Sequence, residues 1–279
     1  MKLGVILSGK KPEDVAQRLA QAREAGFSLC QLNLAQGGYT RADLVAIADS
    51  MLEHGIRPVA VGCYVNPMRP DEPSFAGANR ADLDLILHSL DIVGARRVVI
   101  WSGTHAGSMY EPHAENGSEE SVETLHTFIR SIVAETKARH YSLVIEPWQY
   151  HVLSSEERII AFHERLEPAV REHVRYVLDA TNLITPERYE TLDKEARAVC
   201  RRIGPAAALV HLKDCIMPPD GDHALPGPGQ GRLDYPAYVE AVQRFAAVDA
   251  PAIVRNVRPA EFADVRDRML QLSDRWQLA

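Results

Sequence analysis

The chain has 279 residues, of which 46% are apolar and 25% are charged, and its formal net charge is −7. This composition is ordinary for a soluble globular protein and excludes the fibrous and disordered classes. The basic residues are scattered singly or in pairs, so the sequence lacks the positive stripe that nucleic-acid binding needs.

The N-terminal segment MKLGVILSGKKPED has an apolar run that is too short for a signal-peptide core, and it lacks a small-residue cleavage site. No stretch approaches the ~18 consecutive apolar residues of a membrane span. The cysteines are widely separated, and none forms the C-x-x-C pair of a zinc or redox motif: Cys30, Cys63, Cys200 and Cys215. We therefore expect a cytoplasmic protein with reduced, mostly buried thiols and with no membrane or nucleic-acid partner.

Short apolar runs rich in β-branched residues recur along the chain and predict eight strands. They span residues 2–7, 28–34, 57–64, 96–103, 141–147, 174–180, 208–214 and 251–257. Their apolar character is continuous rather than alternating, which is typical of parallel strands that are covered on their outer face.

Segments with helical periodicity lie between the predicted strands. The segment 40–55 predicts a helix that begins after Thr40 as its N-cap residue and ends at Gly55. A helix is predicted over 185–204, with Thr185 as its cap and Pro186 at its first position. The segment 121–133 carries one apolar stripe, which we expect to face the sheet: Val122, Leu125, Phe128, Ile129, Ile132 and Val133.

Eight strands that alternate with helices, without a linker, predict a single (β/α)8 TIM barrel domain over residues 1–279. A doubly wound open sheet is the alternative, but its glycine-rich turn is missing after the first strand, where only Gly9 is found. Long strand-to-helix connections follow the third, fourth and seventh strands, at 65–77, 102–117 and 215–233. In a barrel these loops emerge at the C-terminal face, where barrel enzymes have their active sites.

Ionisable side chains lie near the ends of three consecutive predicted strands, at equivalent places. Glu146 ends the fifth strand, Asp179 ends the sixth, and His211 lies on the seventh. Adjacent barrel strands are ~4.8 Å apart, so these side chains can converge on a single ion. A lone aspartate here is usually a cap and a lone histidine a core residue, but the three together predict a divalent metal site. Their donors suit Mn²⁺ or Mg²⁺ best, with Co²⁺ and Zn²⁺ as alternatives.

The motifs VIEPW, VLDATN and VHLKD, followed by PGPGQGRLDY, resemble the xylose isomerase-like barrel superfamily of sugar-phosphate isomerases and epimerases. The resemblance implies that Glu146, Asp179 and His211 bind one divalent cation and that the substrate is a small carbohydrate or polyol. It implies ketose epimerisation, aldose–ketose isomerisation or dehydration of a keto-polyol. In each of these a base such as Glu146 would remove a proton next to a carbonyl group held by the cation.

Two positions depart from the pattern of the superfamily. The motif on the sixth strand often ends in histidine where this chain has Asn182, and the eighth strand should carry a glutamate where it has Arg255. A guanidinium neither ligates a metal nor accepts a proton near neutral pH. We therefore expect a weakly bound or substrate-dependent metal, and either an anionic substrate or a reaction that needs only one base. The alternative is that Arg255 turns outward, or pairs with Glu146 or Asp179 in a site that has lost its catalysis.

Further residues near the same rim complete the candidate site. Lys213 shares strand parity with His211, which makes it a candidate for substrate contact or a Schiff base, or for an ion pair with Asp214 or another acid. Four residues are candidate substrate contacts: Trp101, His105, Trp148 and Asn182. Tryptophans at strand ends also serve as barrel plugs, and a loop histidine can be merely solvated.

The sequence therefore predicts a divalent-metal-dependent isomerase or epimerase of a small sugar, sugar phosphate or sugar acid, with Glu146, Arg255 and Lys213 in its catalytic set. A lyase or dehydratase of a keto-sugar or keto-polyol and a non-catalytic sugar-binding barrel are the alternatives. The glycines of 227–231 could bind a phosphate or form a lid. A multi-zinc DNA-repair endonuclease is disfavoured, because His223 lacks a companion aspartate two residues earlier. The sequence leaves the oligomeric state open, a homo-oligomer included.

Overall fold

The computed structural model describes residues 1–136, 141–217 and 224–278. Its strands form one closed parallel barrel in chain order, so the predicted (β/α)8 TIM barrel is confirmed. The strands are β1 (Leu3–Ser8), β2 (Leu29–Asn33), β3 (Arg57–Gly62), β4 (Arg97–Trp101), β5 (Ser142–Glu146), β6 (Val174–Leu178), β7 (Ala207–Leu212) and β8 (Ala252–Val254). β8 pairs with β1 and closes the sheet.

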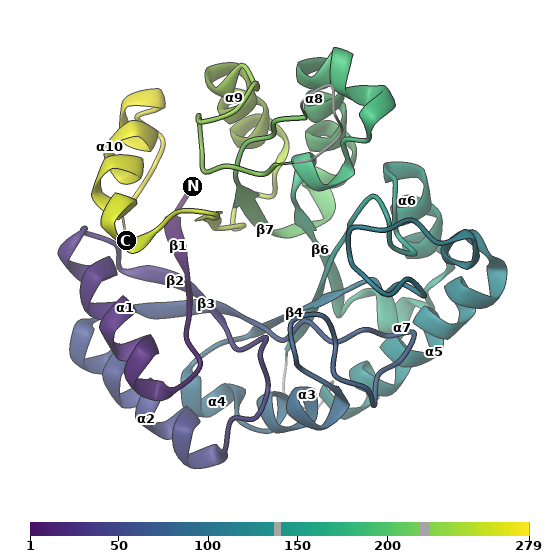
Figure 1. Ribbon diagram of the computed structural model, residues 1–279, viewed down its shortest axis with the longest axis horizontal. Coiled ribbons are helices and arrows are strands. Elements are labelled where there is room, and N and C mark those ends of the chain that lie inside the picture. Colours follow the sequence, from purple (N-terminus) through teal and green to yellow (C-terminus); the bar gives the residue numbers. More distant parts are fainter. Residues whose placement is uncertain (137–140, 218–223, 279) are drawn as a thin grey trace.

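Helices surround the barrel, as Figure 1 shows in a view that looks into it. They are α1 (Pro12–Glu24), α2 (Arg41–His54), α3 (Arg80–Leu87), α4 (Leu90–Val93), α5 (Glu119–Thr136), α6 (Glu156–Arg165), α7 (Pro168–Arg171), α8 (Leu192–Ile203), α9 (Tyr235–Phe245) and α10 (Phe262–Leu272). Short 3-10 segments are η1 (Ala114–Gly117), η3 (Ala180–Leu183), η4 (Pro186–Thr191), η5 (Gly204–Ala206) and η6 (Pro259–Glu261). Within the described ranges, no helix combines the length and the apolar character that a membrane span requires.

The helix ends and faces follow the local sequence. The Thr40 hydroxyl accepts a hydrogen bond from the Asp43 backbone N–H at 3.2 Å. Gly55 has a φ of 62°, a left-handed conformation that glycine adopts without strain. The predicted stripe of α5 is buried, except that Val122 is partly buried. The four cysteines are buried, as predicted.

The helix predicted over 185–204 is wrong in its first turns. Residues Pro186–Thr191 form the 3-10 segment η4, the Thr185 hydroxyl makes no cap, and α8 begins only at Leu192. In this tighter segment the Arg188 guanidinium binds the Glu156 carboxylate of α6 at 2.9 Å and the Leu183 carbonyl at 3.1 Å. These tertiary contacts hold a conformation that the local cap pattern did not predict.

The core has an outer part between strands and helices and an inner part inside the barrel. The inner part is a small cluster that includes one residue from each of five strands: Val99, Val144, Val177, Leu209 and Ile253. Because side chains alternate along a strand, the residues two positions further on also point into the barrel. The packed inner cluster therefore forms the floor beneath the side chains at the C-terminal mouth.

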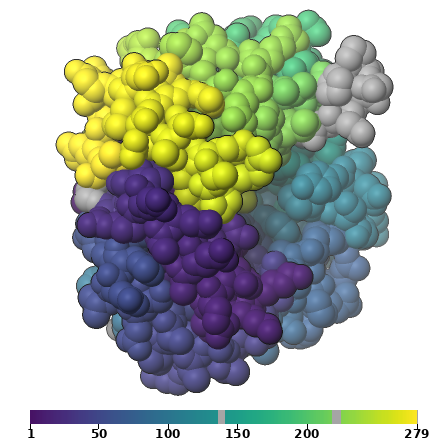
Figure 2. All heavy atoms as spheres, turned by 60° about the vertical axis from the view of Figure 1, so that its left-hand side comes forward, coloured from purple at the N-terminus to yellow at the C-terminus, as the bar shows by residue number. Residues whose placement is uncertain are grey.

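The first and last described segments of the chain lie side by side. Figure 2 shows the purple N-terminal residues against the yellow C-terminal ones on one face of the molecule. The Leu3 N–H donates to the Gln277 carbonyl at 2.9 Å, and the Gln277 N–H donates to the Met1 carbonyl at 3.0 Å. These bonds join the C-terminal segment to the start of β1.

Candidate active site

Three acidic or imidazole side chains and one guanidinium reach the C-terminal mouth of the barrel. Glu146 ends β5, Asp179 directly follows β6, His211 lies on β7, and Arg255 directly follows β8. Each comes two positions after a residue of the inner cluster, so strand alternation directs all of them inward.

Glu146, Asp179 and His211 come together, as the sequence predicted. Their ligand atoms lie within 4.8 Å of one another, and all three residues are buried. Nδ1 of His211 is 3.5 Å from one carboxylate oxygen of Glu146 and 3.5 Å from one of Asp179. By this geometry the cluster could hold a metal ion.

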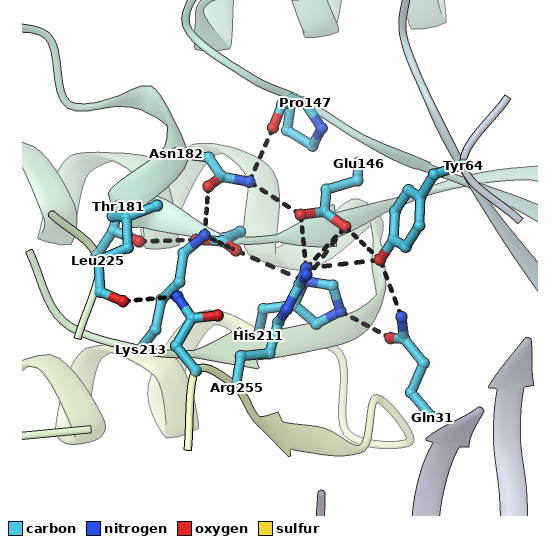
Figure 3. Close-up of polar contacts among 12 residues, drawn as sticks. Gln31, Tyr64, Glu146, Pro147, Thr181, Asn182, His211, Lys213, Leu225 and Arg255 are labelled. Atoms are coloured by element: carbon cyan, nitrogen blue, oxygen red, sulfur yellow. Dashed lines mark hydrogen bonds and ion pairs between the residues drawn. The ribbon is translucent and has the colours of Figure 1, made fainter. Parts of the chain in front are cut away.

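Arg255 turns into the same cluster and pairs with Glu146 (Figure 3). Its Nη1 donates to both oxygens of Glu146, at 2.8 and 3.0 Å, and to Nδ1 of His211 at 2.9 Å. Burial would raise the pKa of Glu146, but the charge of Arg255 holds that pKa well below its usual range. Although burial opposes the charge of Arg255, Glu146 raises its pKa, so both groups are ionised at neutral pH.

Lys213 is the second cation of the cluster, and it is buried and pairs with Asp179. Its Nζ lies 3.0 Å from Oδ2 of Asp179, donates to the Asn182 side-chain oxygen, and lies 5.5 Å from the centre of the Trp148 ring. Burial lowers the pKa of Lys213, which Asp179 partly opposes. Burial would raise the pKa of Asp179, but Lys213 and His211 together lower it below its ordinary value.

The alternative ion pair of Lys213 with Asp214 does not form. One carboxylate oxygen of Asp214 instead accepts from the backbone N–H groups of Cys215 and Leu233, at 2.7 and 3.1 Å. The glycine segment 227–231 packs closely against Asp214. A β-carbon on Gly231 would collide with the Asp214 carboxylate. Asp214 therefore anchors the loop after β7. His223, in the same loop, lies outside the described residues.

Two residues that the sequence analysis did not identify, Gln31 and Tyr64, support the cluster. The Tyr64 hydroxyl donates to Glu146 at 2.7 Å, and Nε2 of Gln31 donates to that hydroxyl at 3.0 Å. The Gln31 side-chain oxygen accepts from Nε2 of His211 at 2.8 Å. The sequence could have indicated Gln31, because it is a polar residue within an apolar strand. Tyr64 lies beyond the end of β3, and no feature of the sequence marked it as a site residue.

Three of the four predicted substrate contacts lie at the cluster. Asn182 donates to Glu146 at 3.1 Å and accepts from Lys213, so it connects the two ion pairs. The Trp101 ring centre is 5.1 Å from that of Tyr64, and Trp148 lies beside Lys213. These residues form the wall of the site.

His105 lies elsewhere, and a different histidine lines the wall. Nε2 of His105 bonds the Ser121 hydroxyl at 2.8 Å, in the segment around η1 and α5. His151, five residues after Glu146, is buried against Trp101 with ring centres 5.8 Å apart. Neither of its ring nitrogens has a hydrogen-bond partner among the described residues. Burial lowers the pKa of His151 to about 3, so its imidazole is neutral.

A divalent cation does not fit the cluster as its side chains stand. The Arg255 guanidinium donates to atoms that the cation would need on both Glu146 and His211. Two cations, the buried Lys213 and the partly buried Arg255, already balance the two buried carboxylates. A metal ion could bind all three residues only if Arg255 withdrew.

A family model described as xylose isomerase-like TIM barrel matches residues 19–263. The chain belongs to this family. No curated protein sequence matches the chain significantly. The family membership agrees with the motifs around Glu146, Asp179 and His211, and with the closed barrel.

Solved structures share the fold. D-allulose 3-epimerase from Methylomonas sp., in complex with D-allulose, has a TM-score of 0.69 and 13% identity, with 98% of this chain and 97% of that chain covered. A xylose isomerase-like TIM barrel protein from Mycobacterium smegmatis, in complex with magnesium, has a TM-score of 0.67 and 14% identity, with coverages of 94% and 88%. An AP endonuclease, family 2, from Brucella melitensis has a TM-score of 0.63 and 16% identity, with coverages of 95% and 98%. At such identities the likeness shows the fold alone.

Proposed function

We propose that the protein is an isomerase that moves a proton between neighbouring carbons of a small sugar or keto-polyol, with Glu146 as the base. The observation that carries this proposal is the ionised Glu146 carboxylate at the mouth of the barrel, between Arg255 and the Tyr64 hydroxyl. The sugar epimerases among the structural neighbours support a carbohydrate substrate.

Two cations can stabilise the charge that such a reaction develops. When a proton leaves the carbon next to a carbonyl group, negative charge builds up on the carbonyl oxygen. Arg255 pairs with Glu146 and Lys213 pairs with Asp179, and Asn182 connects the two pairs. Fixed positive groups in a site with little water stabilise an oxyanion effectively, because they need no reorganisation during the reaction.

The arrangement favours aldose–ketose isomerisation over epimerisation. Inverting a carbon requires proton donation to the face opposite the base. Isomerisation can instead return the proton to the neighbouring carbon on the same face, while the hydroxyl proton passes to the former carbonyl oxygen. The other carboxylate of the cluster, Asp179, is engaged by Lys213 and by the Thr181 hydroxyl, which donates at 2.9 Å. We therefore assign the base to Glu146 alone.

Aromatic side chains from the long loops cover the wall of the site. The ring of Phe75, after β3, lies 6.1 Å from Trp101, and that of Tyr110, after β4, lies 5.7 Å from Trp148. Phe75 is 39% exposed and Tyr110 61%, whereas Glu146 is only 4% exposed. A sugar that approached Glu146 along this wall would find aromatic faces to stack on.

Incubating the protein with a panel of aldoses and ketoses in D₂O, followed by NMR, tests the proposal. We expect isomer formation with deuterium on the carbon next to the carbonyl group. Glu146→Gln should lower the rate by at least about 100-fold. The matched control is Glu190→Gln, whose side chain is 85% exposed, and it should leave the rate unchanged.

Three outcomes would contradict the isomerase. Loss of water from the substrate would identify a lyase. Inversion of a carbon without aldose–ketose interconversion would identify an epimerase. Thermal stabilisation by a sugar without solvent exchange in any substrate would identify a binding protein.

A further inference from the structure

We infer that this site works without a divalent metal ion, because the guanidinium of Arg255 takes the place of the cation. The cluster of Glu146, Asp179 and His211 has a spacing that could hold a metal. Its donor atoms, however, are already engaged, and its charge is already balanced.

The clearest observation concerns the lone pair of His211. Nδ1 of His211 lies 2.9 Å from Nη1 of Arg255, and an arginine N–H can only donate, so Nδ1 is the acceptor. The other ring nitrogen, Nε2, donates to the Gln31 side-chain oxygen at 2.8 Å. A neutral imidazole has one available lone pair, so metal ligation by His211 requires that its bond to Arg255 breaks.

The carboxylate oxygens are engaged in the same way. In Glu146, one oxygen accepts from Arg255 and Asn182, and the other accepts from Arg255 and Tyr64. In Asp179, one oxygen accepts from Thr181 and the other faces the ammonium of Lys213. A metal ion would have to displace donors at Glu146 and His211, and it would compete with the charge of Lys213 for Oδ2 of Asp179, which accepts no hydrogen bond among the described residues.

The charge balance of the cluster also disfavours a bound divalent cation. Arg255 and Lys213 offset the charges of Glu146 and Asp179, so the buried group is neutral overall. A divalent ion would leave two uncompensated positive charges in a region from which water is largely excluded. Arginine stays protonated at every accessible pH, so the site cannot relieve this excess by losing a proton from Arg255.

Substituting Arg255 by glutamate should reverse this balance. Arg255→Glu would remove the competing guanidinium, free the lone pair of His211 and add a carboxylate beside it. With Lys213 retained, three carboxylates and one ammonium carry a net charge of −2, which a divalent cation neutralises. The inference extends the proposed function, but metal binding is measured without a substrate, so either can fail independently of the other.

Titration with MnCl₂, followed by the EPR signal of free Mn²⁺, tests the inference. We expect no saturable site in the wild-type protein and a single site in Arg255→Glu, with affinity higher by at least about 100-fold. Arg258→Glu is the matched control, because it makes the same charge change three residues away on a side chain that is 82% exposed. It should bind Mn²⁺ no better than wild type.

Arg255→Ala serves as a second variant in case the glutamate substitution does not fold. It removes the guanidinium without adding a ligand, and it should bind Mn²⁺ more tightly than wild type. Saturable wild-type binding that Asp179→Asn and His211→Ala both abolish would overturn the inference. So would equal, weak binding by wild type, Arg255→Glu and Arg255→Ala when all three are folded by circular dichroism.

Discussion

The pair of Lys213 and Asp179 is buried on both sides, with side-chain exposures of 4% and 0%. Removing one member of such a pair leaves an uncompensated charge in the interior, whereas removing both leaves none. Because Asp179 also accepts from Thr181, its carboxylate cannot turn toward solvent without losing a second bond.

Lys213→Met should lower the free energy of unfolding by about 3–5 kcal/mol, because Asp179 would then be buried without its partner. The double variant Lys213→Met/Asp179→Asn should recover a large part of that loss. Urea denaturation of the wild type, both single variants and the double variant measures the coupling. Strictly additive losses would show that the two groups do not interact.

The neutral imidazole of His151 makes the stability of the fold dependent on pH. Its pKa is about 3 in the folded protein, compared with 6.5 as the ordinary value. Between these values the unfolded chain binds more protons than the folded one, so stability falls as the pH decreases below about 6.5. By pH 4.5 the loss due to this residue should reach roughly 2–3 kcal/mol.

His151→Phe should remove that part of the acid sensitivity while keeping a ring against Trp101. The measurement is urea denaturation of wild type and variant at pH 7 and pH 4.5. His113→Phe, in an exposed position, should retain the full sensitivity of the wild type. Parallel stability curves for wild type and His151→Phe would mean that the His151 imidazole already accepts a proton in the folded state.

At the level of elements, Gly62, the last residue of β3, leaves space for Gln31 and Tyr64, which contact His211 and Glu146. A β-carbon on Gly62 would collide with the Asn33 side-chain oxygen and would lie 3.1 Å from Nε2 of Gln31 and 3.0 Å from the Tyr64 ring. Glycine is therefore needed at position 62, because β3 packs closely there against the side chains of β2.

Gly62→Ala should destabilise the fold by about 1–3 kcal/mol through overpacking, and it should lower kcat because Gln31 and Tyr64 shift. Gly107→Ala is the control, since a β-carbon there meets nothing within 4 Å. Thermal denaturation and the D₂O assay report the two effects. If Gly62→Ala matches the wild type in both, the close packing around β3 does not position the site.

The sequence predicted most of what depends on local pattern. Continuous apolar runs located the strands, and the polar residues that follow three of them located Glu146, Asp179 and His211. The turns of η4 were missed, because the contacts of Arg188 with Glu156 join segments far apart in the chain. For the same reason the sequence left open whether Arg255 turns inward, since its partner Glu146 lies 109 residues away.

At the scale of the whole molecule, β8 both closes the barrel and leads into Arg255 of the site. This strand has only three residues, whereas the other strands have five or six. It forms three register pairs with each of its neighbours, β1 and β7. The Arg255 backbone N–H, directly after it, donates to the Leu212 carbonyl of β7 at 2.9 Å.

The shortest strand is therefore also the one that supplies the charge paired with Glu146. A fluctuation that separated β8 from β7 would interrupt the ring of strands and carry the guanidinium away from its carboxylate in the same motion. The ion pair of Arg255 with Glu146 resists that separation, because it joins β8 to β5 across the mouth of the barrel. The proposed activity and the closure of the barrel therefore share the boundary between β7 and β8, so local opening there would abolish the proposed activity before the protein unfolds.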